Sequence, residues 1–253
     1  MNLVFAAGVL VPQHFVGHDY FRAAAAAFPG ALFPAVPTTS TVAARAEALA
    51  RQIDAAFPAG PIHVVAHSMG GLDTRSLLSR NLRGLAAPGR IASLSTISSP
   101  HRGSPVADLL VGPEPNGAGV RPFVYSALRH AFDALGLSLD ALGELTTGST
   151  AAFNTAHTNV SHVRYISYAG DRADSIALKP AHLYIESLGQ SDAERVNDGI
   201  VSIASATWGA LITPRWPTDH FGELGYNLNS LTLHSAFDHI AAYRDIVARA
   251  ATT

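Results

Sequence analysis

Cysteine is absent from this 253-residue sequence. Without a thiol the chain forms no disulfide, holds no thiolate-bound metal and has no cysteine nucleophile, although the redox compartment stays open because secreted enzymes can also lack cysteine. Charge is scarce too: charged residues make up 14% of the chain and the formal net charge is −2. Since no basic run is long enough to follow a phosphate backbone, we do not expect binding to nucleic acid or to an anionic membrane by charge.

Long apolar runs are also missing. Arg, Gln, Asp and Pro interrupt the alanine-rich segments before any of them approaches the roughly 20 residues of a membrane-spanning helix. The first residues, MNLVFAAGVLVP, carry no basic leader and lead into a strand pattern, so they are not expected to be a signal peptide. With 48% hydrophobic residues the sequence predicts a soluble globular enzyme, either cytoplasmic or secreted with its leader removed.

Short apolar runs alternate with helical patterns along the chain, which is typical of a parallel sheet with crossover helices. A single α/β domain over residues 1–253 is therefore predicted. The expected strands are Asn2–Ala7, Ala31–Ala35, Ile62–Ala66, Ile91–Ile97 and Val163–Tyr168, and the expected helices are Val42–Phe57 and Met69–Arg80, with an alanine-rich run at Ala23–Phe28.

About 65 residues separate the last two expected strands, far more than an ordinary crossover connection needs. Within residues 106–160, a Gly/Pro loop precedes two amphipathic stretches, Phe123–Leu137 and Leu139–Thr155. Extra core helices would explain this pattern. A helical lid or cap over an apolar pocket is the functional interpretation, since long insertions beside an active site often serve as lids.

A candidate nucleophile lies in the segment Ala66-His67-Ser68-Met69-Gly70-Gly71, between a β-branched strand pattern and a helix pattern. Small residues two before and two after a serine permit the tight strand-to-helix turn of the α/β-hydrolase fold, which presents the hydroxyl to a pocket. Ala66 replaces the usual first glycine. A serine that only caps the helix is the alternative, but the strand, elbow and helix together favour Ser68 as the nucleophile.

A serine nucleophile also needs donors for the oxyanion, a base and a group that orients the base. The elbow predicts the backbone N–H of Met69 as one donor, at the positive end of the helix dipole. The second donor is expected in the loop Ala7-Gly8-Val9-Leu10, where glycine permits a sharp turn and Val9 can direct its amide to the same pocket.

The acid and the histidine follow the nucleophile in the order of the α/β-hydrolase triad. Asp198 lies in an Asn-Asp-Gly turn, which suits a carboxylate on a tight loop, although an ordinary turn has the same composition. Chain order therefore leaves Asp171, Asp174 or Asp198 as the acid and His220, His234 or His239 as the base.

Four separated segments resemble the bacterial true lipases of the Pseudomonas and Burkholderia type, a branch of the α/β-hydrolase superfamily. They occur in order between residues 3 and 224. These segments are Gly8-Val9-Leu10 with Gly17-His18-Asp19-Tyr20-Phe21, the elbow with its double glycine, Ser99-Pro100-His101-Arg102-Gly103-Ser104 with Ala107-Asp108, and Asn197-Asp198-Gly199-Ile200-Val201 with Asp219-His220-Phe221.

This resemblance implies that Asp198 is the orienting acid and His220 the general base, with Asp171 in reserve. The other histidines are expected to be structural. His67 should pack beside the elbow and His101 should organise its loop, while His234 and His239 fall in a helical pattern near the end of the chain.

The family places a structural calcium near the catalytic histidine, bound partly by an aspartate two residues after it. Here that position is Gly222, and a hard cation usually needs more than one carboxylate. Although Asp174 could supply another, we expect neither a metal nor another cofactor. The family also usually has histidine where this chain has Ala7.

The sequence thus predicts a serine carboxylic ester hydrolase, a lipase or esterase, which cleaves esters with apolar acyl groups through an acyl-enzyme. Its partners would be a small-molecule or lipid ester and, transiently, a lipid interface. A thioesterase, a polyester depolymerase or an acyltransferase would share the same fold. From another class, the alternative is a non-catalytic relative that binds a lipid or a partner protein.

Overall fold

A parallel five-stranded sheet forms the centre of the molecule, with the strand order β1-β4-β5-β6-β7. The computed structural model describes all residues except 10–13, 16–17, 135–139, 230–233 and 253. The strands of this sheet are β1 (Asn2–Ala6), β4 (Ile62–His67), β5 (Ile91–Ile97), β6 (Arg164–Tyr168) and β7 (Ala210–Leu211). A separate antiparallel pair joins β2 (His14–Phe15) and β3 (His18–Asp19).

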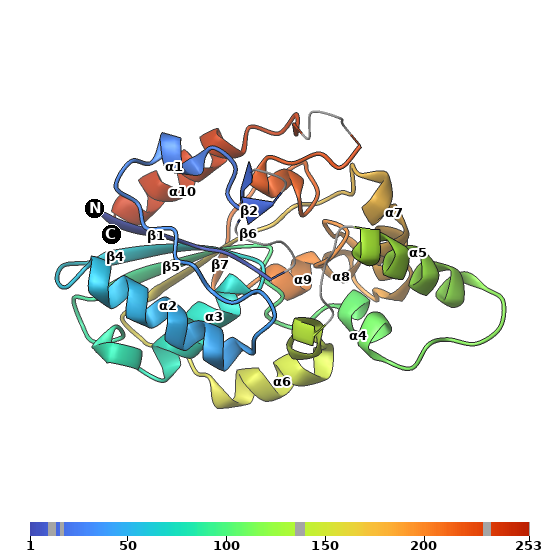
Figure 1. Cartoon of the computed structure of the whole chain (residues 1–253), viewed down its shortest axis with the longest axis horizontal. Coiled ribbons are helices and arrows are strands. Elements are labelled where there is room, and N and C mark those ends of the chain that lie inside the picture. Colours follow the sequence, from blue (N-terminus) through green and yellow to red (C-terminus); the bar gives the residue numbers. More distant parts are fainter. Residues whose placement is uncertain (10–13, 16–17, 135–139, 230–233, 253) are drawn as a thin grey trace.

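Helices cover both faces of this sheet (Figure 1). Side chains of a strand alternate between the two faces. In β1, Val4 belongs to a cluster with α2 (Val42–Ala56) and α3 (Gly70–Ser79), whereas Phe5 belongs to a cluster with α10 (His239–Ala251). The short α1 (Ala24–Ala27) lies on the same face as α10. Both faces of the sheet are therefore buried, which explains why β1 and β4 are mostly apolar.

Most of the expected elements are confirmed, with end shifts of one or two residues. Thr41 caps α2, its side chain accepting a hydrogen bond from the Ala44 amide at 3.3 Å. The expected strand at residues 31–35 is wrong, because only Leu32 forms a bridge, with Val4. Pro34 inside this segment and Pro37 just after it lack the amide that a longer ladder would need.

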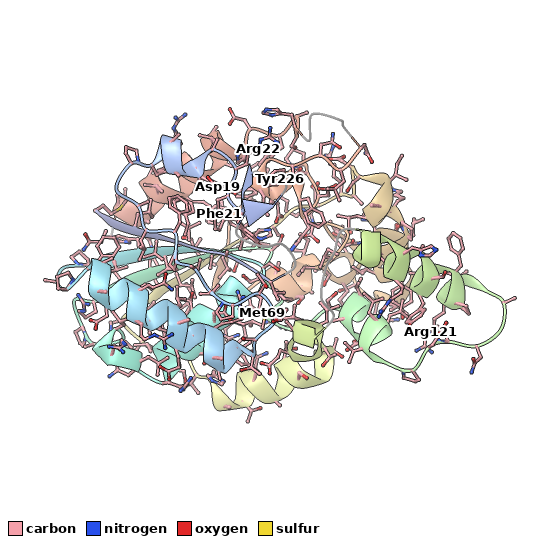
Figure 2. All side chains as sticks on the ribbon, in the orientation of Figure 1. Asp19, Phe21, Arg22, Met69, Arg121 and Tyr226 are labelled. Atoms are coloured by element: carbon pink, nitrogen blue, oxygen red, sulfur yellow. The ribbon has the colours of Figure 1, made fainter. Side chains whose placement is uncertain are left out.

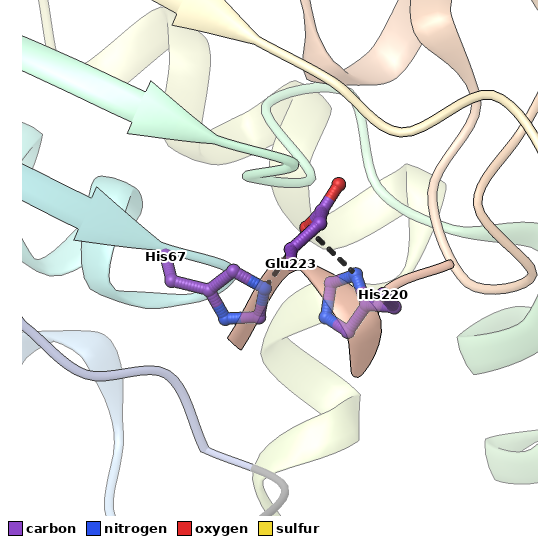
Figure 3. A group of neighbouring side chains, drawn as sticks. All are labelled: His67, His220 and Glu223. Carbon is purple, nitrogen blue, oxygen red and sulfur yellow. Dashed lines mark hydrogen bonds and ion pairs between the residues drawn. The ribbon is translucent and has the colours of Figure 1, made fainter. Parts of the chain in front are cut away.

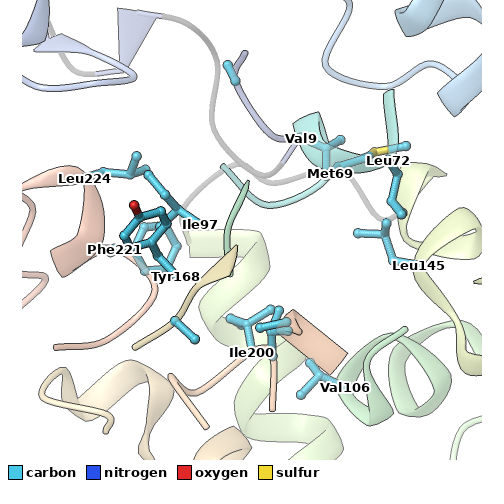
Figure 4. Packing of buried hydrophobic residues seen from close by; sticks show 14 of the residues in the cluster. Val9, Met69, Leu72, Ile97, Val106, Leu145, Tyr168, Ile200, Phe221 and Leu224 are labelled. Atoms are coloured by element: carbon cyan, nitrogen blue, oxygen red, sulfur yellow. The ribbon is translucent and has the colours of Figure 1, made fainter. Parts of the chain in front are cut away.

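The segment between β5 and β6 begins beyond the carboxyl end of the sheet, and its last helix passes beside α3 (Figure 1). Its elements are α4 (Pro105–Val111), α5 (Val120–Ala134), η2 (Asp140–Leu145) and α6 (Thr147–Ala156). The two expected amphipathic stretches thus contain helices, and their junction at residues 135–139 lies outside the described residues. Val106 and Leu145 from this segment join the buried cluster that contains Met69 of the elbow (Figure 4).

Four further short elements and one longer helix lie at the carboxyl end of the sheet. They are η3 (Ile176–Leu178), α7 (Lys179–Leu188), α8 (Asp192–Arg195), α9 (Ile203–Ala206) and η4 (Gly222–Leu224). Another 3-10 turn, η1 (Leu82–Gly84), follows α3. Asp19, Arg22 and Tyr226 lie together above the sheet in Figure 2. The Tyr226 hydroxyl donates to the Asp19 carbonyl and the Arg22 guanidinium lies 5.3 Å from the Tyr226 ring centre, which ties the early loop to the late one.

The start of β1 and the last turn of α10 both lie at the amino edge of the sheet. Asn2 begins β1, and the Arg164 side chain at the start of β6 donates to the carbonyl of Arg249 in the last turn of α10. Among the described residues, no helix is both long enough and apolar enough to span a membrane.

Candidate active site

Ser68 stands at the junction of β4 and α3 with a strained backbone. Its φ is 56°, in the left-handed region that non-glycine residues rarely occupy. Its amide donates to the Ile97 carbonyl at 2.9 Å, which ties the turn to β5. Ala66 is completely buried, and a Cβ added to Gly70 would lie 2.5 Å from the Ala6 carbonyl oxygen. The turn therefore has the shape of a nucleophile elbow, and it tolerates alanine at its first small position.

The loop after β1 passes directly against Ser68. A Cβ added to Gly8 would lie 2.7 Å from the Ser68 Cβ, so only glycine permits this approach. The next residue, Val9, is buried, and Leu10 lies outside the described residues. Met69 occupies the N-cap of α3 on the other side of Ser68. The structure thus brings both predicted donor residues to the two sides of the serine.

His220 and Asp198 form a buried pair. His220 Nδ1 lies 2.7 Å from Asp198 Oδ2, and the His220 amide donates to the Asp198 carbonyl at 3.1 Å. The other carboxylate oxygen of Asp198 accepts from the amides of Ile200 and Val201, at 2.8 and 2.7 Å. These bonds fix the carboxylate on its turn, and the carboxylate fixes the ring of His220 in one orientation.

The second ring nitrogen of His220 has no such constraint. Nε2 is buried and has no hydrogen-bond partner among the described residues, so no hydrogen bond joins it to Ser68 in this state. The His220 ring centre is 4.5 Å from that of His67, the residue before Ser68. A free histidine nitrogen beside the elbow can accept a proton when a substrate draws the two groups together.

The other acid and base candidates lie elsewhere. The Asp171 carboxylate faces the guanidinium groups of Arg172 and Arg215, at 3.3 and 4.0 Å. His239 begins α10 as expected, and its Nε2 contacts the Arg22 carbonyl at 2.8 Å. The expected helix at His234 is wrong. This exposed residue forms a bridge with Tyr226, because Asp238, four residues later, is the residue whose side chain caps α10.

Comparisons with known proteins agree on the class of the chain. It matches no protein-family profile. A triacylglycerol lipase of Vibrio cholerae is 28% identical over 238 residues, which cover 83% of this chain and 73% of that protein. Triacylglycerol lipase 2 of Saccharomyces cerevisiae is 32% identical over 169 residues, 65% of this chain but 46% of the yeast protein. The crystal structure of a metagenomic carboxyl esterase superposes with a TM-score of 0.72 at 22% identity, covering 100% of this chain and 76% of that one.

The chain is an α/β-hydrolase of the lipase and esterase group. This group consists of carboxylic ester hydrolases, and the parallel sheet with its elbow agrees with that class. The hydrolase spans less than half of its yeast relative. A triacylglycerol lipase of Burkholderia plantarii is 34% identical, but only over 116 residues, 42% of this chain and 31% of that protein, so the narrower resemblance to lipases of that type stays a prediction.

Sequence reasoning missed Glu223, a completely buried carboxyl group of this hydrolase (Figure 3). Its Oε2 lies 3.0 Å from His67 Nε2 and 4.0 Å from His220 Nδ1. Its Oε1 accepts from the Ser98 hydroxyl at 2.5 Å and from the Gly170 amide at 2.8 Å. Burial raises the pKa of Glu223 well above its ordinary value, and the neighbouring negative charge of Asp198 acts in the same direction. The spacing of three residues between His220 and Glu223 was the available signal, since a 3-10 turn brings such positions together.

His67 does more than pack beside the elbow. Its ring joins the Tyr20 hydroxyl, 2.7 Å from Nδ1, to Glu223. Burial lowers the pKa of His67 well below its ordinary value. His101 lies in its loop as expected: its amide donates to the Ser205 carbonyl at 3.1 Å, and its Nε2 lies 3.2 Å from the Thr96 hydroxyl.

The donor atoms of His67, His220 and Glu223 lie within 4.8 Å of one another, but their geometry does not fit a metal ion. His67 Nε2 and Glu223 Oε2 are 3.0 Å apart and already share a hydrogen bond. His220 Nδ1 is bound to Asp198. An ion between these atoms would have to displace both hydrogen bonds.

The residues at the expected calcium position do not fit that cation either. Gly222 offers no side chain, and the nearby Asp219 carboxylate is fully engaged. Its Oδ2 accepts from the amide and hydroxyl of Ser175, at 2.8 and 2.5 Å, while Oδ1 accepts from the amides of Phe221 and Gly222, at 3.2 and 2.8 Å. The two bonds from Ser175 tie the loop after β6 to the turn that carries His220, and the other two lie within that turn. A direct protein bridge therefore stands where the resemblance implies a metal.

Proposed function

We propose that this protein hydrolyses carboxylic esters with apolar acyl groups, with Ser68 as nucleophile, His220 as general base and Asp198 as the acid that orients it. The observation that carries the proposal is the strained, positive φ of Ser68 beside a histidine whose Nδ1 is bound to a carboxylate and whose Nε2 has no partner among the described residues. Both features cost stability in a purely structural protein. Both serve acyl transfer.

In the proposed reaction, Ser68 Oγ attacks the ester carbonyl carbon while His220 Nε2 takes the hydroxyl proton. The negative charge that develops on the carbonyl oxygen is held by the amides of Val9 and Met69. Asp198 stabilises the resulting imidazolium. Collapse of the tetrahedral intermediate breaks the ester C–O bond, and His220 returns the proton to the departing alcohol. Water then repeats these steps on the acyl-enzyme and releases the acid.

The surroundings of the site support an apolar acyl group. Ser68 is only 3% exposed and His220 only 2%, so the site is closed. Leu145 and Val106 of the insertion share a buried cluster with Met69 and Val9 (Figure 4). An acyl chain that enters here would replace apolar contacts by similar ones. We infer that residues 106–160 act as a lid and that lipid esters are the substrate class, as the names of the two curated relatives suggest.

Hydrolysis of p-nitrophenyl esters of increasing acyl length tests the chemistry. Ser68→Ala should lose activity by at least about 10³-fold, because no other group replaces the nucleophile. Ser95→Ala is the matched control, since the hydroxyl of Ser95 on β5 is buried and has no hydrogen-bond partner among the described residues. Equal rates for Ser68→Ala and Ser95→Ala would refute the proposal.

Labelling by a fluorophosphonate separates a hydrolase from a non-catalytic binding protein. The wild type should be labelled at Ser68, and His220→Ala should slow the labelling. A binding protein with the same fold would not react. Product analysis with a thioester, a polyester film and an added alcohol would then distinguish the thioesterase, depolymerase and acyltransferase variants of the same chemistry.

The lid is tested with tributyrin on either side of its solubility limit. A lid that opens at a lipid interface predicts a rise in rate when droplets form, beyond the increase in substrate concentration. A rate that follows the dissolved concentration alone, through and beyond the limit, would show that the insertion is a fixed cap.

A further inference from the structure

Arg45 is a completely buried arginine behind the loop that faces Ser68. It lies in the first turn of α2, and its guanidinium donates to the carbonyls of three residues. Nη2 donates to Ala7 and Gly8, at 2.8 and 3.1 Å, and Nη1 donates to Pro37 at 2.5 Å. Two successive carbonyls of the loop after β1 therefore point at one guanidinium nitrogen.

The direction of these carbonyls determines the direction of the amides. In a trans peptide the C=O and the N–H point in opposite directions, and the described residues contain no cis peptide at Gly8 or Val9. Since the Gly8 carbonyl points toward Arg45, the Val9 amide must point away from Arg45. Gly8 itself lies against the Ser68 Cβ. Among the described residues, none accepts a hydrogen bond from the Val9 amide.

Arg45 is held in turn by Asp73 of α3, the helix that begins at the elbow. Asp73 Oδ2 accepts from Arg45 Nε at 2.9 Å and lies 2.8 Å from Nη2. The other oxygen, Oδ1, is buried and has no partner in the described part of the chain, so Asp73 supports Arg45 and little else through its side chain. A buried ion pair contributes little net stability, and an apolar pair of similar volume often folds as well. The unfavourable burial of these two charges is better explained if the pair positions the loop after β1.

We propose that Arg45, held by Asp73, is a positioning residue for the oxyanion hole: it locks the Gly8–Val9 peptide so that the Val9 amide donates to the substrate oxygen. This inference rests on the proposed function of Ser68 and Val9. Loss of the lock leaves the ester free to bind but lets the peptide rotate, which removes one donor in the transition state.

The experiment compares Arg45→Gln, Arg45→Lys and Asp73→Asn with a matched control, Arg75→Gln. Arg75 is also a buried arginine, on α3, but its guanidinium lies 3.5 Å from the Trp208 ring centre and donates to Asn154. The readouts are kcat, KM, the melting temperature and the affinity for an alkyl trifluoromethyl ketone, whose adduct with serine carries an oxyanion.

Loss of one oxyanion donor lowers kcat by about 10² to 10³-fold. We expect Arg45→Gln to show about that loss, with KM changed less than about threefold and the ketone affinity reduced in parallel with kcat. Arg45→Lys and Asp73→Asn should fall between this variant and wild type. Arg75→Gln should lose thermal stability but keep both kcat and ketone affinity. Guanidinium ion at low concentration should partly restore Arg45→Ala, in which the side chain leaves a matching space.

The inference is overturned if the Arg45 variants keep kcat and ketone affinity, or lose them only as far as Arg75→Gln does at equal loss of stability. If Arg45→Gln does not fold, Arg45→Lys and Asp73→Asn decide. The first keeps a positive charge at position 45, and the second keeps Arg45 beside a neutral partner. Wild type and Ser68→Ala are assayed beside them. An active Ser68→Ala refutes the proposed function, whereas inactive Ser68→Ala together with active Arg45 variants refutes only this inference.

Discussion

Replacement of Gly70 by alanine should damage catalysis more than stability. A Cβ at this position would lie 2.5 Å from the Ala6 carbonyl oxygen and 2.9 Å from that of Ala7, whereas ordinary contacts begin at 3.4 Å. The neighbouring backbone must therefore retreat by 3.4 − 2.5 = 0.9 Å. Overpacking of this kind costs about 1–3 kcal/mol. The elbow would move away from the loop that carries Val9, and misplacement of about 1 Å can lower a rate about 10²-fold.

The assay pairs a thermal melt with kcat on a p-nitrophenyl ester. For a domain of this size, the expected loss corresponds to a decrease in melting temperature of about 2–12 °C. Gly148→Ala is the control: it lies inside α6, nothing is within 4 Å of its added Cβ, and alanine should stabilise the helix slightly. If Gly70→Ala keeps kcat within about threefold of Gly148→Ala, the close approach does not control the geometry of the elbow.

Three more predictions concern the buried carboxylates Asp73 and Asp219 and the effect of calcium. Burial raises the pKa of Asp73 from 3.8 to about 6, so this group favours folding below pH 4 and that contribution is lost as the pH rises through 6. Urea titrations between these pH values should therefore show the wild type losing about 3 kcal/mol of unfolding free energy relative to Asp73→Asn. A difference between the two proteins that does not change with pH would contradict the shift. Asp219→Asn should cost about 1–3 kcal/mol, because in either orientation of the amide its NH2 group faces donors, either those of Ser175 or the amides of Phe221 and Gly222. Unchanged denaturant midpoints would argue against the bridge. Excess EDTA, and then excess calcium, should leave the melting temperature unchanged, whereas a rise with calcium would reveal a site.

Local sequence patterns were sufficient to predict the elements on either side of Ser68. Four of the six residues of Ile62–His67 are apolar because a parallel strand is buried on both faces, and Gly70 marks the close approach behind the elbow. Asp198 and His220 were chosen by order and resemblance, and the structure places them 2.7 Å apart. These features depend on residues close in sequence or on a motif, so a single chain can reveal them.

The features that could not be predicted from the sequence depend on contacts between distant segments. Arg45 follows an ordinary helix start, and nothing near it in sequence indicates that it reaches the loop of Gly8 or the carboxylate of Asp73. Glu223 meets His67 across 156 positions of the chain. A charged residue in a helical pattern is usually solvated, so only the tertiary structure distinguishes these buried groups from surface ones.

The position of the two chain ends has a practical consequence. Asn2 and the last turn of α10 lie at the amino edge of the sheet, and the elbow opens at the carboxyl edge, where the insertion lies (Figure 1). A protein immobilised on a bead, or displayed on a cell, through either end would point its catalytic edge away from the support. A droplet or an insoluble ester could then reach the insertion without the support in the way.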